Sequence, residues 1–213
     1  MSHLIKHCIR LKKPLPAGIL RVNFLTQLQP FIMSFTFNKL NIPEVILIES
    51  SVSTDDRGFF TEVFKASEFE KHGVATSFVQ DNFSHSKKGV IRGLHYQLNP
   101  KAQGKLVRVI KGKIMDIAVD VRHDSPTFLQ KVEVELSEEN NRMLFIPPGF
   151  AHGFVALSDE VKFLYKCTAE YSKEHERGIR FDDPNINIDW RISDPLVSEK
   201  DLMLPYAKDA EVF

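Results

Sequence analysis

The sequence predicts an all-β domain built as a sandwich or a barrel. From about residue 44 onward, short runs with apolar residues at every second position are separated by Gly, Pro, Asn and Asp. A side-chain period of two is typical of a strand whose two faces meet different surroundings. Many short strands at regular spacing indicate a sandwich or barrel, and 213 residues is an ordinary length for one such domain. The hydrophobic content of 43%, with 17 Phe, supports a sizeable core.

The first half of this domain is predicted to contain several strands, a tight turn and one short helix. The turn is expected at residues 55–58, because Asp-Asp-Arg-Gly suits a β-turn. Ser67 and Gly73 bracket one or two helical turns, with Ser67 as the candidate N-cap. The segment 84–88 reads as a polar turn. The predicted strands are residues 44–50, 59–65 and 77–83, followed by apolar runs that begin at Val90 and Leu106.

The second half shows the clearest alternation. Apolar residues at positions 115, 117, 119 and 121 alternate with Asp116, Ala118, Asp120 and Arg122, which predicts a half-buried antiparallel strand. Residues 132–136 repeat the pattern, and the prolines at 147–148 break the chain before a strand at 152–157. In the following strand, positions 161, 163, 165 and 167 share one face. After residue 182 the pattern becomes irregular, apart from a short helix at 197–202 capped by Ser198.

Charge and cysteine content exclude several classes of protein. Lys plus Arg equal Asp plus Glu at 28 each, so no net field attracts nucleic acid. No apolar run reaches the roughly 18 residues that a membrane helix needs. Two distant cysteines, Cys8 and Cys167, form no disulfide framework and suit a reducing compartment. We therefore expect a cytoplasmic protein that binds neither nucleic acid nor membrane.

Residues 1–32 are predicted to be a basic N-terminal extension, and residues 33–213 a single domain. The first 43 residues contain six Lys and Arg and no Asp or Glu, which leaves the remainder with a formal charge of −6. An acid-poor start is a feature of organelle transit peptides, but the segment has almost no serine. An upstream start or a lineage-specific extension fits better, and we expect it to contribute little to catalysis.

Candidate chemistry is concentrated in residues 89–108, GVIRGLHYQLNPKAQGKLVR. His95 is flanked by the cations Arg92, Lys105 and Arg108, and nearby positive charge favours a neutral imidazole that can act as a base. Lys105 lies across a turn at Asn99-Pro100, where it could stabilise an oxyanion in the same pocket. The alternative without a catalytic role is a half-buried strand followed by a solvated basic turn.

This stretch and six further motifs resemble the dTDP-4-dehydrorhamnose 3,5-epimerases, from about residue 33 to the C-terminus. The motifs are GVIRGLHYQ and QGKLVRVIKGKIMDIAVDVR, DDRGFFTEVF (55–64), FVQDN (78–82), SPTF (125–128), IPPGFAHGFVALSD (146–159), FLYKCTAEYSKEHERGIRFDDP (163–184) and SEKD (198–201). The resemblance implies a cupin-type jelly roll, a homodimer and a dTDP-4-keto-6-deoxy sugar as substrate. The reaction it implies removes and returns the acidic protons on the two carbons that flank a ketone, carbons 3 and 5.

The resemblance also assigns catalytic roles. His95 matches the base, and Asp201 matches the carboxylate that orients this histidine. Tyr165 matches the acid on the opposite face of the sugar, and Lys105 matches the group that stabilises the enolate. From the sequence alone, Asp201 would be an ordinary surface acid, Tyr165 a core tyrosine and Lys105 a solvated turn lysine.

Ten further positions match substrate-binding residues of the family. Basic groups among them suit a diphosphate, and Phe59 and Tyr171 are candidates to stack on thymine. Arg92 and His95 are three residues apart, so a regular strand would point them to opposite faces. Either a bulge at Gly93 reconciles them, or Arg92 reaches the pocket of a neighbouring subunit. The ten are Arg57, Phe59, Glu62, Gln80, Asn82, Arg92, His152, Tyr171, Glu176 and Lys200.

No metal or other cofactor is expected. Metal-binding cupins use His-x-His, whereas His95 is followed by Gln97 and His152 stands alone. One departure from the family is Phe83, where many members have histidine, and it could alter the pocket wall. The alternatives that remain are a single-carbon epimerase of another deoxysugar, a non-catalytic sugar-binding cupin and a metal-dependent cupin enzyme. The retained Tyr165 argues against the first and the missing His-x-His against the last.

Overall fold

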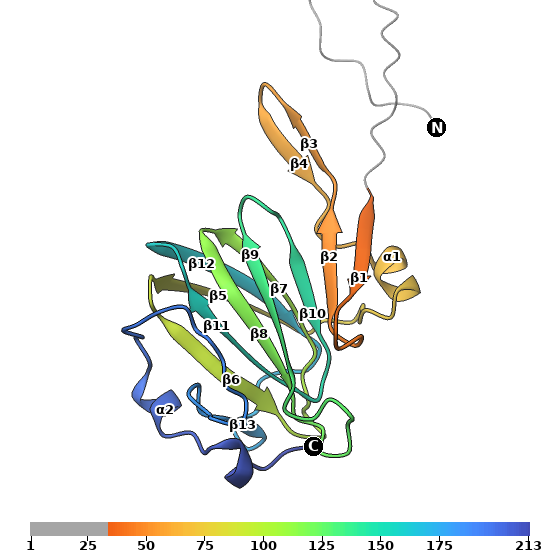
Figure 1. Cartoon of the computed structure of the whole chain (residues 1–213). Coiled ribbons are helices and arrows are strands. Elements are labelled where there is room, and N and C mark those ends of the chain that lie inside the picture. The colour runs from red at the N-terminus through yellow and green to blue at the C-terminus, as the bar shows by residue number, and fades with distance from the viewer. Residues whose placement is uncertain (1–33) are drawn as a thin grey trace, which may run out of the picture. The chain divides into compact units, whose positions relative to one another are not determined.

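The computed structural model describes residues 34–213, and these form two antiparallel sheets packed face to face (Figure 1). The larger sheet contains, in spatial order, β1 (Phe35–Lys39), β2 (Ile46–Ser50), β10 (Met143–Ile146), β7 (Lys105–Lys111), β12 (Glu160–Cys167) and β5 (Gln80–Lys87). The smaller sheet contains β13 (Glu176–Gly178), β6 (Ile91–Gln97), β11 (Phe150–Ala156), β8 (Lys113–Asp120) and β9 (Lys131–Ser137). The predicted all-β sandwich is confirmed. The predicted extension, residues 1–32, lies outside the described residues.

The main core fills the space between the sheets. Val107 and Phe163 of the larger sheet meet Ile114, Ala118 and Phe154 of the smaller one, and all five side chains are buried. Burial of a large apolar side chain stabilises a fold by roughly 1.5–3 kcal/mol, so this cluster holds the sheets together. In the described part of the chain, no helix has the length and apolar character needed to cross a membrane.

The strand β8 is buried on both faces, so the prediction of a half-buried strand is wrong. Its outward residues, such as Ile117, are covered by the irregular C-terminal segment, including Trp190. Its inward polar residues Asp116 and Asp120 are fully buried between the sheets. The alternation was recognised correctly, but the sequence did not show that the C-terminal segment covers the second face.

The outer face of the larger sheet is partly covered by α1 (Ala66–Lys71). Phe69 of this helix packs edge-on against Phe35 and Phe37 of β1, with ring centroids 5.2 and 5.3 Å apart. The predicted helix is present, but its N-cap is Lys65 and not Ser67.

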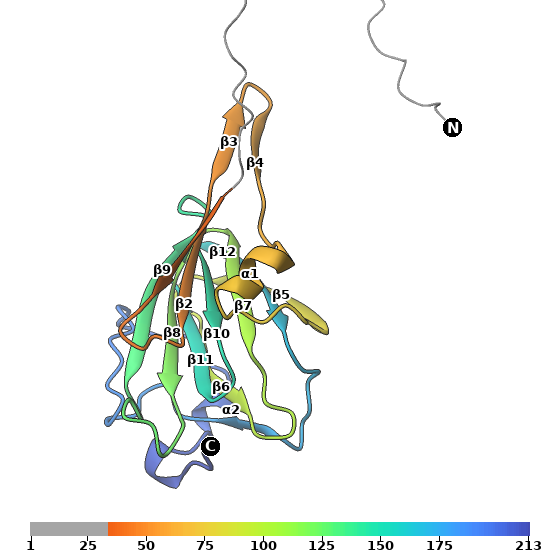
Figure 2. The same cartoon turned by 90° about the vertical axis from the view of Figure 1, so that its right-hand side faces the viewer.

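Two predicted strand ends are also wrong. β5 continues to Lys87 through the segment predicted as a polar turn, because its whole length pairs with β12. The strand predicted at 59–65 ends at Thr61 and belongs to a separate hairpin of β3 (Val52–Asp55) and β4 (Gly58–Thr61). This hairpin projects beyond the end of the sandwich in both views (Figures 1 and 2). It exposes Phe59 and Phe60, at 64% and 65%.

The C-terminal region packs against the smaller sheet. It contains α2 (Glu199–Leu202) and a short 3-10 helix, η1 (Ala207–Asp209). The predicted cap of α2 is confirmed, because Ser198 Oγ accepts a hydrogen bond from the backbone N–H of Asp201 at 3.1 Å. This cap fixes the carboxylate of Asp201 beside β6.

Candidate active site

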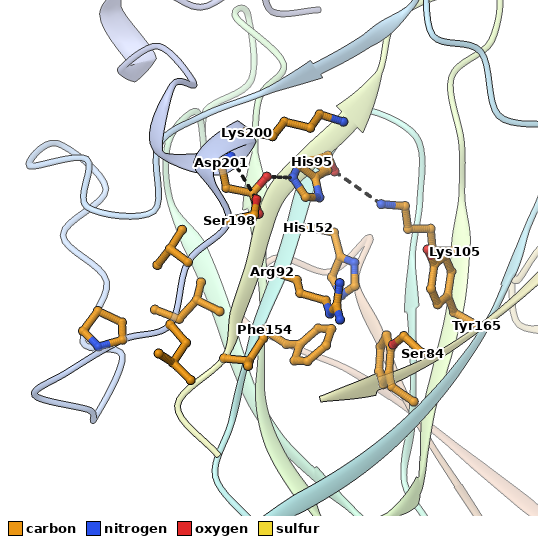
Figure 3. A pocket seen from close by; sticks show the side chains of 16 residues that line it. Ser84, Arg92, His95, Lys105, His152, Phe154, Tyr165, Ser198, Lys200 and Asp201 are labelled. Carbon is orange, nitrogen blue, oxygen red and sulfur yellow. Dashed lines mark hydrogen bonds and ion pairs between the residues drawn. The ribbon is translucent and has the colours of Figure 1, made fainter. Parts of the chain in front are cut away.

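A cavity of about 650 Å³ lies between the sheets, with polar groups converging on it from both walls (Figure 3). β6 and β11 supply Arg92, His95 and His152, and β5, β7 and β12 supply the facing residues. The C-terminal segment closes one side. The polar residues that line the cavity are Ser84, Arg92, His95, Lys105, His152, Tyr165, Ser198, Lys200 and Asp201.

His95 and Asp201 form a hydrogen-bonded pair at the edge of this cavity. His95 Nε2 lies 2.7 Å from Asp201 Oδ1, and the side chains are 30% and 5% exposed. Burial raises the pKa of Asp201, but the hydrogen bond and charge of His95 outweigh it, so the pKa lies below its ordinary value. The carboxylate therefore accepts a hydrogen bond from Nε2–H and leaves Nδ1 as the ring nitrogen available to a ligand.

A bulge in β6 brings Arg92 to the same cavity as His95. His152 pairs with His95 and Phe154 with Arg92, so two steps along β11 match three along β6. Gly93 provides the extra residue, with φ of 130°. A Cβ at this position would lie 2.5 Å from the Cα of Gly153, so no other residue fits without a shift of the backbone. The predicted bulge at Gly93 is confirmed.

Lys105 is a buried cation at the start of β7. Its side chain is 9% exposed, and Nζ donates to the backbone oxygen of His95 at 3.3 Å. Burial has the largest effect on the pKa of Lys105 and holds it below its ordinary value. The neighbouring Cys167 and Asp116 act in the opposite direction but are weaker. An ammonium held in low dielectric beside the base is well placed to stabilise an oxygen that becomes negative.

Tyr165 lies on β12, across the cavity from His95 (Figure 3). Its ring packs against Phe163 with centroids 5.6 Å apart. Burial raises the pKa of the Tyr165 phenol, so the hydroxyl keeps its proton at neutral pH. The hydroxyl can therefore donate a proton from the wall opposite the His95–Asp201 pair.

A second histidine–aspartate pair lies deeper in the sandwich. His152 Nε2 is 2.9 Å from Asp116 Oδ2, and both side chains are almost completely buried. Burial lowers the pKa of His152, against the opposing effect of Asp116. The sequence motifs include His152 among the predicted site residues but give no sign of Asp116, because an acid on the polar side of an alternating strand normally faces water. One feature of the sequence could have identified Asp116 as buried: it lies on the same strand face as the apolar residue Ala118.

A smaller cavity of about 340 Å³ continues from the first and shares His95, Lys105 and Tyr165 with it. Gln80, Asn82, Tyr171 and Glu176 also line it. Their groups are linked in a network: Gln80 Nε2 donates to Asn82 Oδ1 at 3.0 Å, and Tyr171 donates to Glu176 at 2.9 Å. Lys200 reaches the same carboxylate at 2.6 Å. Eleven of the fourteen predicted site residues thus line these two adjoining cavities.

Three predicted binding residues lie elsewhere. Arg57 and Phe59 line a separate hollow of about 250 Å³ on the β3–β4 hairpin, where Arg57 pairs with Asp55. Glu62 lines none of these three cavities, and one of its buried carboxyl oxygens has no hydrogen-bond partner among the described residues. Phe83 lines neither of the two adjoining cavities: it is 63% exposed, and its neighbours Asn82 and Ser84 face inward instead.

Among residues 34–213, no group of three or more His, Cys, Asp or Glu side chains is arranged to hold a metal ion. The polar groups of the cavity form pairs and hydrogen-bond networks, as described above.

Comparisons with known proteins agree on one family. A sequence model of dTDP-4-dehydrorhamnose 3,5-epimerase matches residues 39–209. The dTDP-4-dehydrorhamnose 3,5-epimerase of Shigella flexneri is 53% identical over 176 residues, which cover 82% of this chain and 97% of that protein. The crystal structure of the Sulfolobus tokodaii enzyme of the same name has a TM-score of 0.79 and 50% identity, covering 84% of this chain and 98% of that one.

A third relative was solved with a sugar nucleotide bound. It is the dTDP-6-deoxy-D-glucose-3,5-epimerase of Legionella pneumophila in complex with dTDP-4-keto-L-rhamnose. Its TM-score is 0.80 at 46% identity, over 83% of this chain and 94% of that one. The sandwich described above is therefore the cupin-type jelly roll of these enzymes. With a family match over most of its length, the chain belongs to the dTDP-4-dehydrorhamnose 3,5-epimerase family.

Proposed function

We propose that the two adjoining cavities are one active site, in which His95, Asp201, Tyr165 and Lys105 carry out the chemistry. As a member of its family, the chain converts dTDP-4-dehydro-6-deoxy-D-glucose to dTDP-4-dehydro-L-rhamnose in dTDP-L-rhamnose biosynthesis. The observation that carries the assignment is the hydrogen-bonded His95–Asp201 pair facing Tyr165 across one cavity. A base and an acid on opposite walls are what inversion at carbon requires.

The first half of each inversion is removal of a proton next to the ketone. His95 Nδ1 takes the proton from carbon, and the resulting imidazolium is stabilised by Asp201 through Nε2. The electron pair of the broken C–H bond moves into the enolate, whose oxygen binds the ammonium of Lys105. Because the ketone of the substrate itself acidifies the two C–H bonds, we expect the reaction to need no cofactor.

The second half returns a proton to the opposite face of the same carbon. Tyr165 is placed to donate from that face, because it extends from the sheet opposite His95. We assign Tyr165 chiefly to carbon 5. Solvent then restores the proton of Tyr165, and His95 releases its own, so the protons balance over one inversion.

The rest of the site binds the nucleotide sugar. Arg92 and Lys200 provide positive charge at the cavity wall for the diphosphate. The amides and hydroxyl of Gln80, Asn82 and Tyr171 offer hydrogen bonds in the smaller cavity, and we assign that cavity to the nucleoside. His152 and Glu176 complete the predicted binding set.

We also propose a cytoplasmic homodimer in which the β3–β4 hairpin of each chain reaches the active site of its partner. Arg57 and Phe59 match substrate-binding residues, yet they lie on a hairpin that projects from the sandwich. Exposed aromatic rings such as Phe59 and Phe60 are typical of surfaces that contact another molecule. A second copy of the chain would bring this hairpin to a pocket and cover its apolar surface.

The direct test is proton NMR of dTDP-4-keto-6-deoxyglucose in deuterium oxide with the enzyme and no added metal. We expect the signals of the protons on carbons 3 and 5 to disappear, and the product to form when a reductase that makes dTDP-rhamnose is coupled. The variant His95→Ala, checked for its fold by circular dichroism, should exchange neither proton. Exchange at a single carbon would instead support a single-carbon epimerase, and no exchange would support a sugar-binding protein.

A further inference from the structure

The inward side of β5 carries a row of polar side chains, and Ser84 is the member without a hydrogen-bond partner in the part of the chain that the structure describes. Asn82 donates to Cys167 Sγ at 3.6 Å, and Arg92 Nε donates to Ser86 Oγ at 3.1 Å. Ser84 Oγ is buried and has no hydrogen-bond partner among the described residues. Nearly all buried hydroxyls in proteins are hydrogen-bonded, so this one calls for a functional explanation.

Ser84 is part of the wall of the larger cavity. It pairs in register with Phe163 of β12, two residues along that strand from the pair formed by Asn82 and Tyr165. Figure 3 shows Ser84 on the same side of the cavity as Tyr165, across from His95. Its hydroxyl group therefore lies beside the wall that receives the sugar ring.

We infer that the Ser84 hydroxyl binds the 2-hydroxyl of the sugar and makes the enzyme selective for sugars that carry it. The inference rests on the function proposed above and on the assignment of the smaller cavity to the nucleoside. The keto-sugar ring of the substrate has free hydroxyls only on carbons 2 and 3. Carbon 3 is inverted during the reaction, so its hydroxyl changes direction, whereas the hydroxyl on carbon 2 stays in place and can serve as a fixed handle.

The two cavities place the sugar ring beside Ser84. The cavities meet at His95, Lys105 and Tyr165, whereas Ser84 lines only the larger one. A ligand whose nucleoside occupies the smaller cavity therefore extends its sugar into the larger cavity, between the base His95 and the wall that carries Ser84 (Figure 3).

The hydroxyl reaches the ligand by rotation about a single bond. The Ser84 side chain as a whole is partly exposed, although its oxygen is buried. Serine has three staggered rotamers, and a change of χ1 between them can turn the oxygen toward the cavity. The rotation breaks no hydrogen bond to the described residues.

The test compares two sugars in two proteins. Wild type and Ser84→Ala are assayed for kcat/KM with dTDP-4-keto-6-deoxyglucose and with its 2-deoxy analogue. We expect Ser84→Ala to lose roughly 3- to 10-fold on the normal substrate, the usual effect of one neutral hydrogen bond, and to match wild type on the analogue. For each sugar, the quantity compared is the ratio of kcat/KM between wild type and Ser84→Ala. The 2-hydroxyl changes the acidity of the neighbouring carbon equally in both proteins, so this effect cancels in the ratio.

Ser86→Ala is the matched control, because Ser86 lies on the same strand face but contacts Arg92 instead of the cavity. It should lower kcat/KM by the same factor for both sugars. Equal losses on both sugars in Ser84→Ala, or none on either, would overturn the inference. Ser84→Cys, which keeps the volume of the side chain with a weaker hydrogen bond, should reproduce the result if Ser84→Ala folds poorly. An inactive wild type would refute the proposed function instead, so the two failures are distinguishable.

Discussion

Asp120 shows how a single buried carboxylate can control stability in this fold. It is fully buried and accepts hydrogen bonds from Arg122, Ser125 and Thr127. Burial raises the pKa of Asp120, but the hydrogen bonds from these three residues outweigh it and lower the pKa to about 2. Because the folded pKa lies below the ordinary 3.8, the stabilisation is complete above about pH 4 and is lost as the pH falls toward 2.

We therefore predict that Asp120→Asn lowers the free energy of unfolding by roughly 2–3 kcal/mol at pH 7, the scale of hydrogen bonds to a charged group. Urea unfolding from pH 7 down to pH 3 should show the gap to wild type narrowing below about pH 4. Asp124→Asn is the control, because that side chain is fully exposed and should change stability by less than about 0.5 kcal/mol. A gap that stays constant over the whole pH range would contradict this account.

The residues of the site differ in how far the sequence could predict them. His95, Lys105 and Tyr165 were predicted from motifs, and they line one cavity in the structure. Asp116 was not, because it occupies a polar position of an alternating strand, and such positions normally face solvent. Ser84 was not, because it fell in the segment predicted as a polar turn, which the structure shows as part of β5. Only the packing of the second sheet turns these positions inward. The sequence pattern describes a strand but not what covers it.

At the scale of elements, the bulge in β6 is the feature on which the geometry of the site depends most. We predict that Gly93→Ala lowers the free energy of unfolding by more than about 1 kcal/mol and reduces turnover. The added Cβ would lie 2.5 Å from the backbone of Gly153, which would straighten or displace the strand that carries Arg92 and His95. Thermal unfolding and the exchange assay in deuterium oxide measure the two effects.

The variant Gly58→Ala separates the cost of an unfavourable backbone conformation from the cost of a steric contact. Gly58 has φ of 127°, close to the 130° of Gly93, but an added Cβ would meet no atom within 4 Å. Its loss of stability should therefore reflect conformation alone and be clearly smaller. Equal losses in the two variants would show that the close approach of β6 to β11 is not what requires glycine at position 93.

Element boundaries were predicted less well than element types. The strands on either side of the core were recognised because their alternation is strict, as in residues 132–136. β5 extends further than expected because pairing with β12 outweighs the turn propensity of Ser84 and Lys87. Such pairing is a long-range contact, and a local reading of polar residues does not contain it.

At the scale of the whole molecule, the proposed dimer explains why the site residues are divided between two places. The cavity contains the groups for catalysis, whereas Arg57 and Phe59 lie on the projecting hairpin. If the hairpin serves the pocket of the partner, neither chain has a complete site alone. In a mixed dimer, an intact hairpin on one chain can then compensate for a defective hairpin on the other. This makes the arrangement testable.

We predict that two defective variants restore activity when they share a dimer. His95→Ala lacks the base, and the double variant Arg57→Ala, Phe59→Ala lacks the hairpin contacts, so each homodimer should be strongly impaired. In the mixed dimer, the pocket that retains His95 receives the intact hairpin of the His95→Ala chain. Co-expression with two affinity tags isolates this species, and its activity should approach half that of wild type. If the hairpin served its own chain, the only pocket with His95 would lack a working hairpin, and the mixed dimer would be no more active than the two homodimers.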